Sequence, residues 1–142
     1  MKSLKYLLII VVLGIVGLVL NQRAEADINI INVDEYTSFK QIDAKDAKDL
    51  MDNNTNYIIL DVRTYMEYEE GHIANAVVLP NEEIVEGNKK VTEFLPDKNQ
   101  MILVYCRSGR RSIEAAGKLA KMGYTNIYDF GGIIDWPYEI IK

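Results

Sequence analysis

The chain has 142 residues, a formal net charge of −5 and a pI near 4.9, and it contains one cysteine. This length suits one domain, and the acidic balance argues against a nucleic acid partner, because such partners are bound through clustered positive charge. A single cysteine excludes an intramolecular disulfide.

The N-terminus, residues 1–26, has the layout of a secretory signal peptide. Lys2 and Lys5 precede an unbroken apolar run over 6–20, and Ala24-Glu25-Ala26 has the small-x-small spacing that a signal peptidase prefers. As a helix the run would rise ~22 Å, somewhat short of a ~30 Å hydrocarbon core. Snorkelling by Lys5 and Arg23 would extend its reach, so an uncleaved membrane anchor stays open. The basic start predicts that the rest of the chain is extracytoplasmic: secreted, periplasmic or anchored to the outer face of the cell membrane.

Residues 27–38 are predicted to be a linker, and 39–142 a folded domain that begins with a short strand at Phe39 to Ile42. A helix follows, with Asp43 as its N-cap and its end at Asn53-Asn54.

Further along, short apolar runs typical of buried strands alternate with helical segments. The predicted strands are 56–63, 75–80, 99–106 and 126–132. The predicted helices are 64–71, two pieces of 81–95 broken at Gly87, and 108–124, and the closing segment 133–141 is partly helical. The helix over 108–124 has a predicted apolar face of Ile113, Ala116, Gly117 and Ala120. This alternation predicts an α/β fold with a small, mainly parallel sheet flanked by helices.

The cysteine, Cys106, ends the strongest predicted strand and leads into the strongest predicted helix, at the edge where parallel sheets form their sites. A tight loop with a glycine can turn its backbone N–H groups toward one centre and bind an anion. The same field lowers a thiol's pKa and favours the nucleophilic thiolate. Arg107, Arg110 and Arg111 add bidentate donors for an oxyanion. The alternative is a buried structural cysteine, which would leave arginines opposing the helix dipole without any gain.

The segment "CRSGRRS" resembles the active-site loop of rhodanese-like sulfurtransferases. "LDVRTYMEYEEGHIANAVVLP" and "DFGGIIDW" resemble that family's other two signatures, in the family's order and spacing, so the resemblance covers about 39–136. Asn75 and Pro137 depart from the family pattern, and neither lies in the loop.

The resemblance implies a mechanism in which Cys106 takes sulfur from an anionic donor such as thiosulfate and becomes a persulfide. The terminal sulfur would pass to a thiol, to cyanide or to a protein acceptor. The resemblance also implies that the loop binds the substrate, and that no metal or organic cofactor is needed. The implied substrate-binding residues are Arg107, Ser108, Gly109, Arg110 and Arg111.

Two alternatives remain open. Related phosphatases and arsenate reductases have an arginine six positions after the cysteine, where this chain has Ser112, so the loop length favours sulfur transfer. The other alternative is a persulfide carrier or interaction module that relays sulfur to a partner without turnover on small donors.

Three residues outside the loop are candidates for a role at the site. Asp61 ends a strand on the same edge as Cys106 and either binds substrate or organises the turn that follows. Arg63 is predicted to pair with Glu67 or Glu70 and hold that turn. His72, the one histidine, is a candidate general base, whereas the resemblance implies a structural turn.

Overall fold

The computed structural model describes residues 38–142. The predicted signal peptide or anchor lies outside these residues, as does the predicted linker except for Ser38. Within 38–142 the structure contains no helix of sufficient length and apolar character to cross a membrane.

Five parallel strands form the central sheet in the order β1-β6-β5-β2-β4. In chain order they are β1 (Phe39–Gln41), β2 (Tyr57–Asp61), β4 (Ala76–Val78), β5 (Met101–Cys106) and β6 (Ile127–Gly132). The most apolar strand, β5, lies in the middle and is buried along all but its first residue, as expected for a parallel sheet covered on both faces. The predicted α/β fold with a mainly parallel sheet is confirmed.

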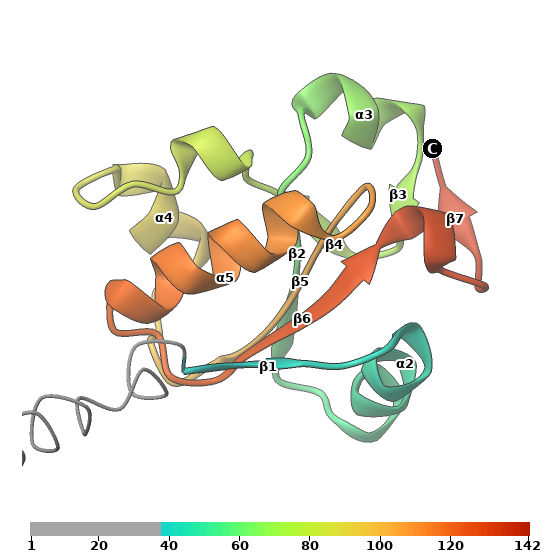
Figure 1. Cartoon of the computed structure of the whole chain (residues 1–142), viewed down its shortest axis with the longest axis horizontal. Coiled ribbons are helices and arrows are strands. Elements are labelled where there is room, and N and C mark those ends of the chain that lie inside the picture. The colour runs from blue at the N-terminus through green and yellow to red at the C-terminus, as the bar shows by residue number, and fades with distance from the viewer. Residues whose placement is uncertain (1–37) are drawn as a thin grey trace, which may run out of the picture. The chain divides into compact units, whose positions relative to one another are not determined.

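Helices cover both faces of this sheet. Residues 38–142 contain four α-helices: α2 (Ala44–Asn53), α3 (Tyr65–Glu70), α4 (Lys89–Phe94) and α5 (Arg110–Lys121). Figure 1 shows α4 and α5 on one side of the sheet, α2 on the other, and α3 beyond the carboxyl ends of the strands. Alternate residues of β5 serve the two cores: Val104 packs toward α4 and α5, and Leu103 toward α2.

Local sequence signals fix where these helices begin and end. Asp43 caps α2 by accepting a hydrogen bond from the backbone N–H of Asp46 at 2.8 Å. Gly123 has φ +88° just after α5, the left-handed conformation that ends a helix. The apolar face predicted for α5 is partly wrong, because Ile113 is 44% exposed and the buried positions are Ser112, Ala115, Ala116 and Leu119.

Several short elements complete the domain. The predicted break at Gly87 lies between a 3-10 turn, η2 (Asn81–Glu83), and α4. The closing segment contains a 3-10 turn, η3 (Ile133–Asp135), and then a strand that the sequence did not predict. That strand, β7 (Ile140–Ile141), pairs antiparallel with β3 (His72–Ile73) and holds the chain end against the segment that follows α3.

Candidate active site

Cys106 lies at the carboxyl end of β5, where the chain turns into α5. The residue is 1% exposed, and the backbone N–H of Gly109 donates a hydrogen bond to its Sγ at 3.1 Å. Gly109 has φ +102°, a left-handed conformation that a glycine adopts without strain, and α5 begins at the next residue. Residues 106–111, here called the cysteine loop, therefore curl their backbone around the sulfur.

The loop lowers the pKa of the Cys106 thiol. Burial alone would raise this pKa, but hydrogen bonds from the N–H and hydroxyl of Ser112 and from the N–H groups of Gly109 and Ser108 outweigh burial and bring it below its ordinary value. The Ser112 hydroxyl has one proton and also donates to the Gly109 carbonyl at 2.9 Å. The backbone N–H groups are therefore the constant donors, and they favour the nucleophilic thiolate.

The three arginines of the loop have different surroundings. Arg107 and Arg110 are exposed, and neither belongs to an ion pair within residues 38–142. Arg111 is 20% exposed and binds Glu67 of α3 through two hydrogen bonds, Nη1 to Oε2 and Nη2 to Oε1, both 2.8 Å. The sequence did not predict this pair, although the Thr64-x-x-Glu67 pattern of a capping box marked Glu67 as a structured position.

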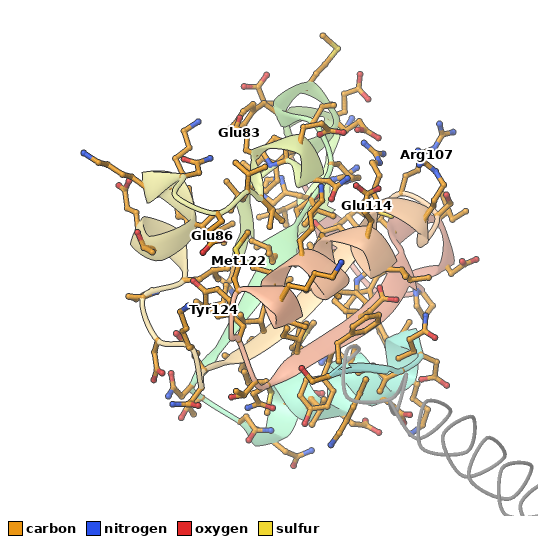
Figure 2. The ribbon with its side chains drawn as sticks, turned by 60° about the vertical axis from the view of Figure 1, so that its left-hand side comes forward. Glu83, Glu86, Arg107, Glu114, Met122 and Tyr124 are labelled. Atoms are coloured by element: carbon orange, nitrogen blue, oxygen red, sulfur yellow. The ribbon has the colours of Figure 1, made fainter. Side chains whose placement is uncertain are left out.

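A hollow of about 320 Å³ lies beside the loop, and we call it the rim hollow. Its lining combines charged and apolar side chains: Arg63, Glu67, Glu70, Arg107, Ile133 and Ile134. Figure 2 shows Arg107 projecting outward from the body of the domain. The backbone N–H of Ile134 donates to the Arg107 carbonyl at 3.2 Å, which ties the segment after β6 to the loop.

Asp61 also lies on this edge, but it is completely buried. Its carboxylate accepts hydrogen bonds from the backbone N–H and the guanidinium of Arg63 at 2.6–3.0 Å, and from the Tyr105 hydroxyl at 2.6 Å. Arg63 Nη2 also donates to the Gly71 carbonyl at 2.7 Å. These contacts favour the turn-organising role for Asp61 over substrate binding. The prediction that Arg63 pairs with Glu67 or Glu70 was wrong, because its partner is Asp61. The hydrogen bond from the Tyr105 hydroxyl to Asp61 was not predicted.

His72 is held by the turn that follows α3. Its ring stacks on Tyr68 at 3.6 Å between centroids, and its Nδ1 lies 2.9 Å from the Tyr68 carbonyl oxygen, so Nδ1 is the donor there. Its backbone pairs with Ile141 in β7. These contacts are those of a structural residue.

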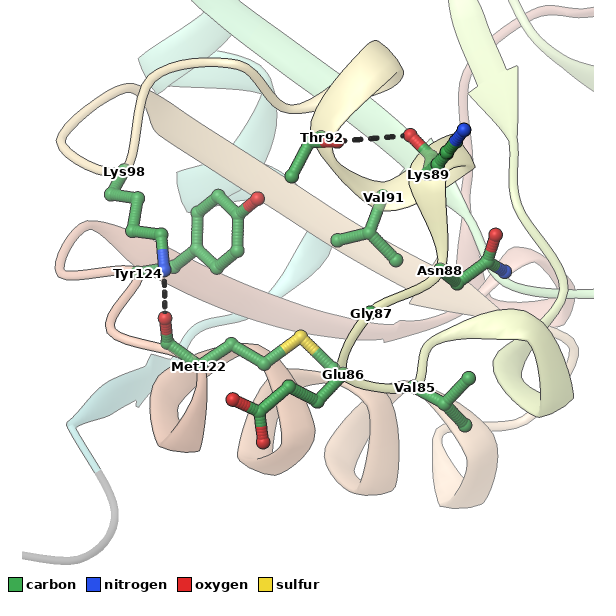
Figure 3. A pocket seen from close by; sticks show the side chains of 10 residues that line it. All are labelled: Val85, Glu86, Gly87, Asn88, Lys89, Val91, Thr92, Lys98, Met122 and Tyr124. Atoms are coloured by element: carbon green, nitrogen blue, oxygen red, sulfur yellow. Dashed lines mark hydrogen bonds between the residues drawn. The ribbon is translucent and has the colours of Figure 1, made fainter.

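A second hollow, of about 260 Å³, lies between α4 and the end of α5 (Figure 3). Among its polar groups, the Lys98 ammonium donates to the Met122 carbonyl and lies 5.3 Å from the centre of the Tyr124 ring. No residue of the cysteine loop lines this hollow, so it contributes nothing to the chemistry of Cys106.

Comparison with known proteins connects this geometry to a family. A model of the rhodanese-like domain matches residues 43–137. The thiosulfate sulfurtransferase PspE of Escherichia coli K12 is 37% identical over 83 residues, which are 58% of this chain and 77% of that protein. A tRNA uridine(34) hydroxylase of Photorhabdus laumondii is 33% identical over 104 residues, 72% of this chain but 28% of that protein. Among solved structures, a rhodanese with anions from E. coli has a TM-score of 0.55 and 32% identity, with coverage of 61% of this chain and 98% of that one.

Proposed function

The chain belongs to the rhodanese-like domain family, and from that premise we propose that it is a sulfurtransferase that carries sulfur as a persulfide on Cys106. The donor is an anionic compound with a sulfane sulfur, and the acceptor is a thiol, cyanide or a protein. The observation that carries the proposal is the set of loop N–H groups directed at Cys106 Sγ, of which Gly109 lies at 3.1 Å.

The transfer has two displacement steps. The Cys106 thiolate attacks the outer sulfur of thiosulfate; a new S–S bond forms, the S–S bond of thiosulfate breaks, and its electron pair leaves with sulfite. The acceptor then attacks the terminal sulfur of the persulfide, and the electron pair of that S–S bond returns to Cys106 Sγ. The persulfide is an anion, so the N–H groups that favour the thiolate also favour it. No metal or organic cofactor takes part in either step.

The residues around Cys106 have separate roles in this proposal. The backbone N–H groups of Arg107 to Arg111 surround the terminal sulfur, while the exposed guanidinium groups of Arg107 and Arg110 attract the donor and stabilise its leaving group. At the position where a phosphatase would need an arginine, Ser112 is fully buried and donates to the Gly109 carbonyl.

The proposed setting is extracytoplasmic, and the support for it is the signal-peptide pattern of residues 1–26. N-terminal sequencing of the mature protein tests it. Cleavage after Ala26 is the expected result for a secreted or periplasmic protein, and a retained Met1 indicates a membrane anchor.

Intact mass spectrometry tests the proposed reaction. The full-length protein is incubated with thiosulfate, and the expected result is a gain of one sulfur atom, removed by cyanide and absent in Cys106→Ser. An adduct formed only from a persulfidated protein would indicate a carrier. Absence of an adduct from any sulfur donor, together with release of phosphate from an aryl phosphate, would contradict the proposal in favour of an oxyanion enzyme.

A further inference from the structure

Glu67 is fixed by contacts on both sides. Toward α3, its Oε2 accepts hydrogen bonds from the backbone N–H and the hydroxyl of Thr64, both at 3.0 Å, and completes a capping box. Toward the cysteine loop, its two oxygens accept the two Nη groups of Arg111, both at 2.8 Å. One carboxylate therefore connects the start of α3 to the last residue of the loop.

The Glu67 carboxylate is ionised at neutral pH. The Arg111 guanidinium, and after it the N–H and hydroxyl of Thr64, outweigh partial burial and lower the pKa of Glu67 to about 2. A bidentate pair of opposite unit charges has a much weaker effect on a third charge than an unpaired guanidinium has. An incoming donor therefore meets two uncompensated guanidinium groups, Arg107 and Arg110, rather than three.

The rim hollow beside the loop carries a second carboxylate. Glu70 lines it together with Glu67, and the lining guanidinium of Arg63 is already neutralised by Asp61 at 2.6 Å. The exposed guanidinium of Arg107 also lines the hollow, and the remaining walls, Ile133 and Ile134, are apolar; Ile134 is 63% exposed. The unpaired Glu70 carboxylate repels a dianion twice as strongly as a monoanion and so opposes the attraction of Arg107, whereas an organic group gains by covering apolar surface.

We propose that Glu67 determines which donor the site prefers: by neutralising Arg111 it favours the persulfide of a small organic thiol over dianionic thiosulfate. The inference depends on the proposed sulfurtransferase function and narrows its donor. Cys106 thiolate attacks the outer sulfur of R–S–SH, the S–S bond of the donor breaks, and its electron pair leaves with the thiolate R–S⁻. The outer sulfur moves with its proton to Cys106, and the resulting persulfide releases that proton to solvent to become the anion that the loop N–H groups favour. The hollow, about 320 Å³, lies near the ~300 Å³ lower end of small-molecule sites, which suits a small thiol.

The test compares kcat/KM for cysteine persulfide with kcat/KM for thiosulfate in the full-length protein. The wild type is expected to prefer the persulfide, and Glu67→Gln is expected to shift the ratio ~10-fold toward thiosulfate at low salt and less at high salt. Glutamine keeps the capping box, so the helix start is retained. The matched control is Glu69→Gln on the same helix; Glu69 is exposed and lies outside the hollow, and the ratio should not change.

A substitution of Arg111, the other member of the ion pair, provides a second test. Arg111→Gln leaves Glu67 uncompensated and should shift the ratio ~10-fold away from thiosulfate. The double variant restores the net charge of the wild type, so its ratio should return close to the wild-type value. Altered folding alone would not produce opposite shifts that cancel.

Three results would overturn the inference: an unchanged ratio in Glu67→Gln with both reactions retained, an equal loss of both reactions in that variant, or shifts of the same sign in Glu67→Gln and Arg111→Gln. Failure of the underlying function looks different, because the wild-type protein would then gain no sulfur from either donor.

Discussion

Two carboxylate–guanidinium pairs lie at the same edge of the sheet and have similar geometry, yet their surroundings differ. In the Asp61–Arg63 pair, at 2.6 Å, the side chains are 0% and 7% exposed, and the Tyr105 hydroxyl and the Gly71 carbonyl complete the hydrogen bonding. In the Glu67–Arg111 pair, at 2.8 Å, they are 25% and 20% exposed, and the pair borders the loop that holds Cys106. Because the first pair is buried, we expect it to stabilise the fold. The second pair is partly exposed beside Cys106, so we expect it to influence sulfur transfer.

The largest effect is expected from breaking the buried pair. Asp61→Ala leaves the Arg63 guanidinium and the Tyr105 hydroxyl buried without their partner, which should lower the free energy of unfolding by ~3–5 kcal/mol. Urea denaturation of the variant and the wild type measures this difference. The double variant Asp61→Ala/Arg63→Met removes the unpaired charge and should recover part of the loss. A cost below ~1 kcal/mol for Asp61→Ala would mean that the buried pair does not hold the fold.

An intermediate effect is expected at the contact between β6 and the cysteine loop. A Cβ at Gly132 would lie 2.6 Å from Ser108 Cα and closer still to the Arg107 carbonyl oxygen, so the loop must move. Gly132→Ala should cost ~1–3 kcal/mol of unfolding free energy and should abolish sulfur transfer. Unfolding by urea and the rate of thiosulfate consumption measure the two effects.

The matched control for that substitution is Gly117→Ala in α5, where a Cβ meets nothing within 4 Å. Alanine favours a helix interior over glycine, so this variant should gain ~0.5–1 kcal/mol and keep its activity. Full activity in Gly132→Ala would show that the close packing of β6 against the loop does not shape the site.

The smallest effect on stability is expected at the partly exposed Glu67–Arg111 pair. Glu67→Gln should lower the unfolding free energy by only ~0–1 kcal/mol at neutral pH, since partly exposed pairs contribute little. The pKa of Glu67, about 2, lies below its ordinary value of 4.5. Its contribution is therefore complete above pH 4.5 and is lost as the pH falls toward 2, so the two proteins should converge in acid. Urea unfolding at several pH values measures this. A loss as large as that of Asp61→Ala would erase the distinction between the pairs.

Much of the fold could be predicted from the sequence, because the apolar runs of β2, β4, β5 and β6 and the capping residue Asp43 are local signals. The position of Cys106 at the carboxyl edge followed from the same strand pattern. The pairing of β3 with β7 could not be predicted, since two-residue strands carry no periodicity and their partners are distant in the chain.

The contacts within the site were harder to predict than the elements. Arg63 has four carboxylates nearby in the sequence, and only the three-dimensional turn shows that it binds Asp61 while Glu67 faces Arg111. The exposed position of Ile113 depends on where α5 lies on the sheet, which the periodicity of one helix does not determine.

The central claim is that the cysteine loop stabilises an anion on Cys106 Sγ, and the pH profile of Cys106 alkylation tests it most directly. The rate of reaction with iodoacetamide is measured against pH in the full-length protein, with Cys106→Ser as the blank. Because the loop N–H groups lower the pKa of this thiol, the midpoint of the profile should lie below the ~8.5 of an unperturbed cysteine. A midpoint at or above ~8.5 would show that burial outweighs the loop and would contradict the account.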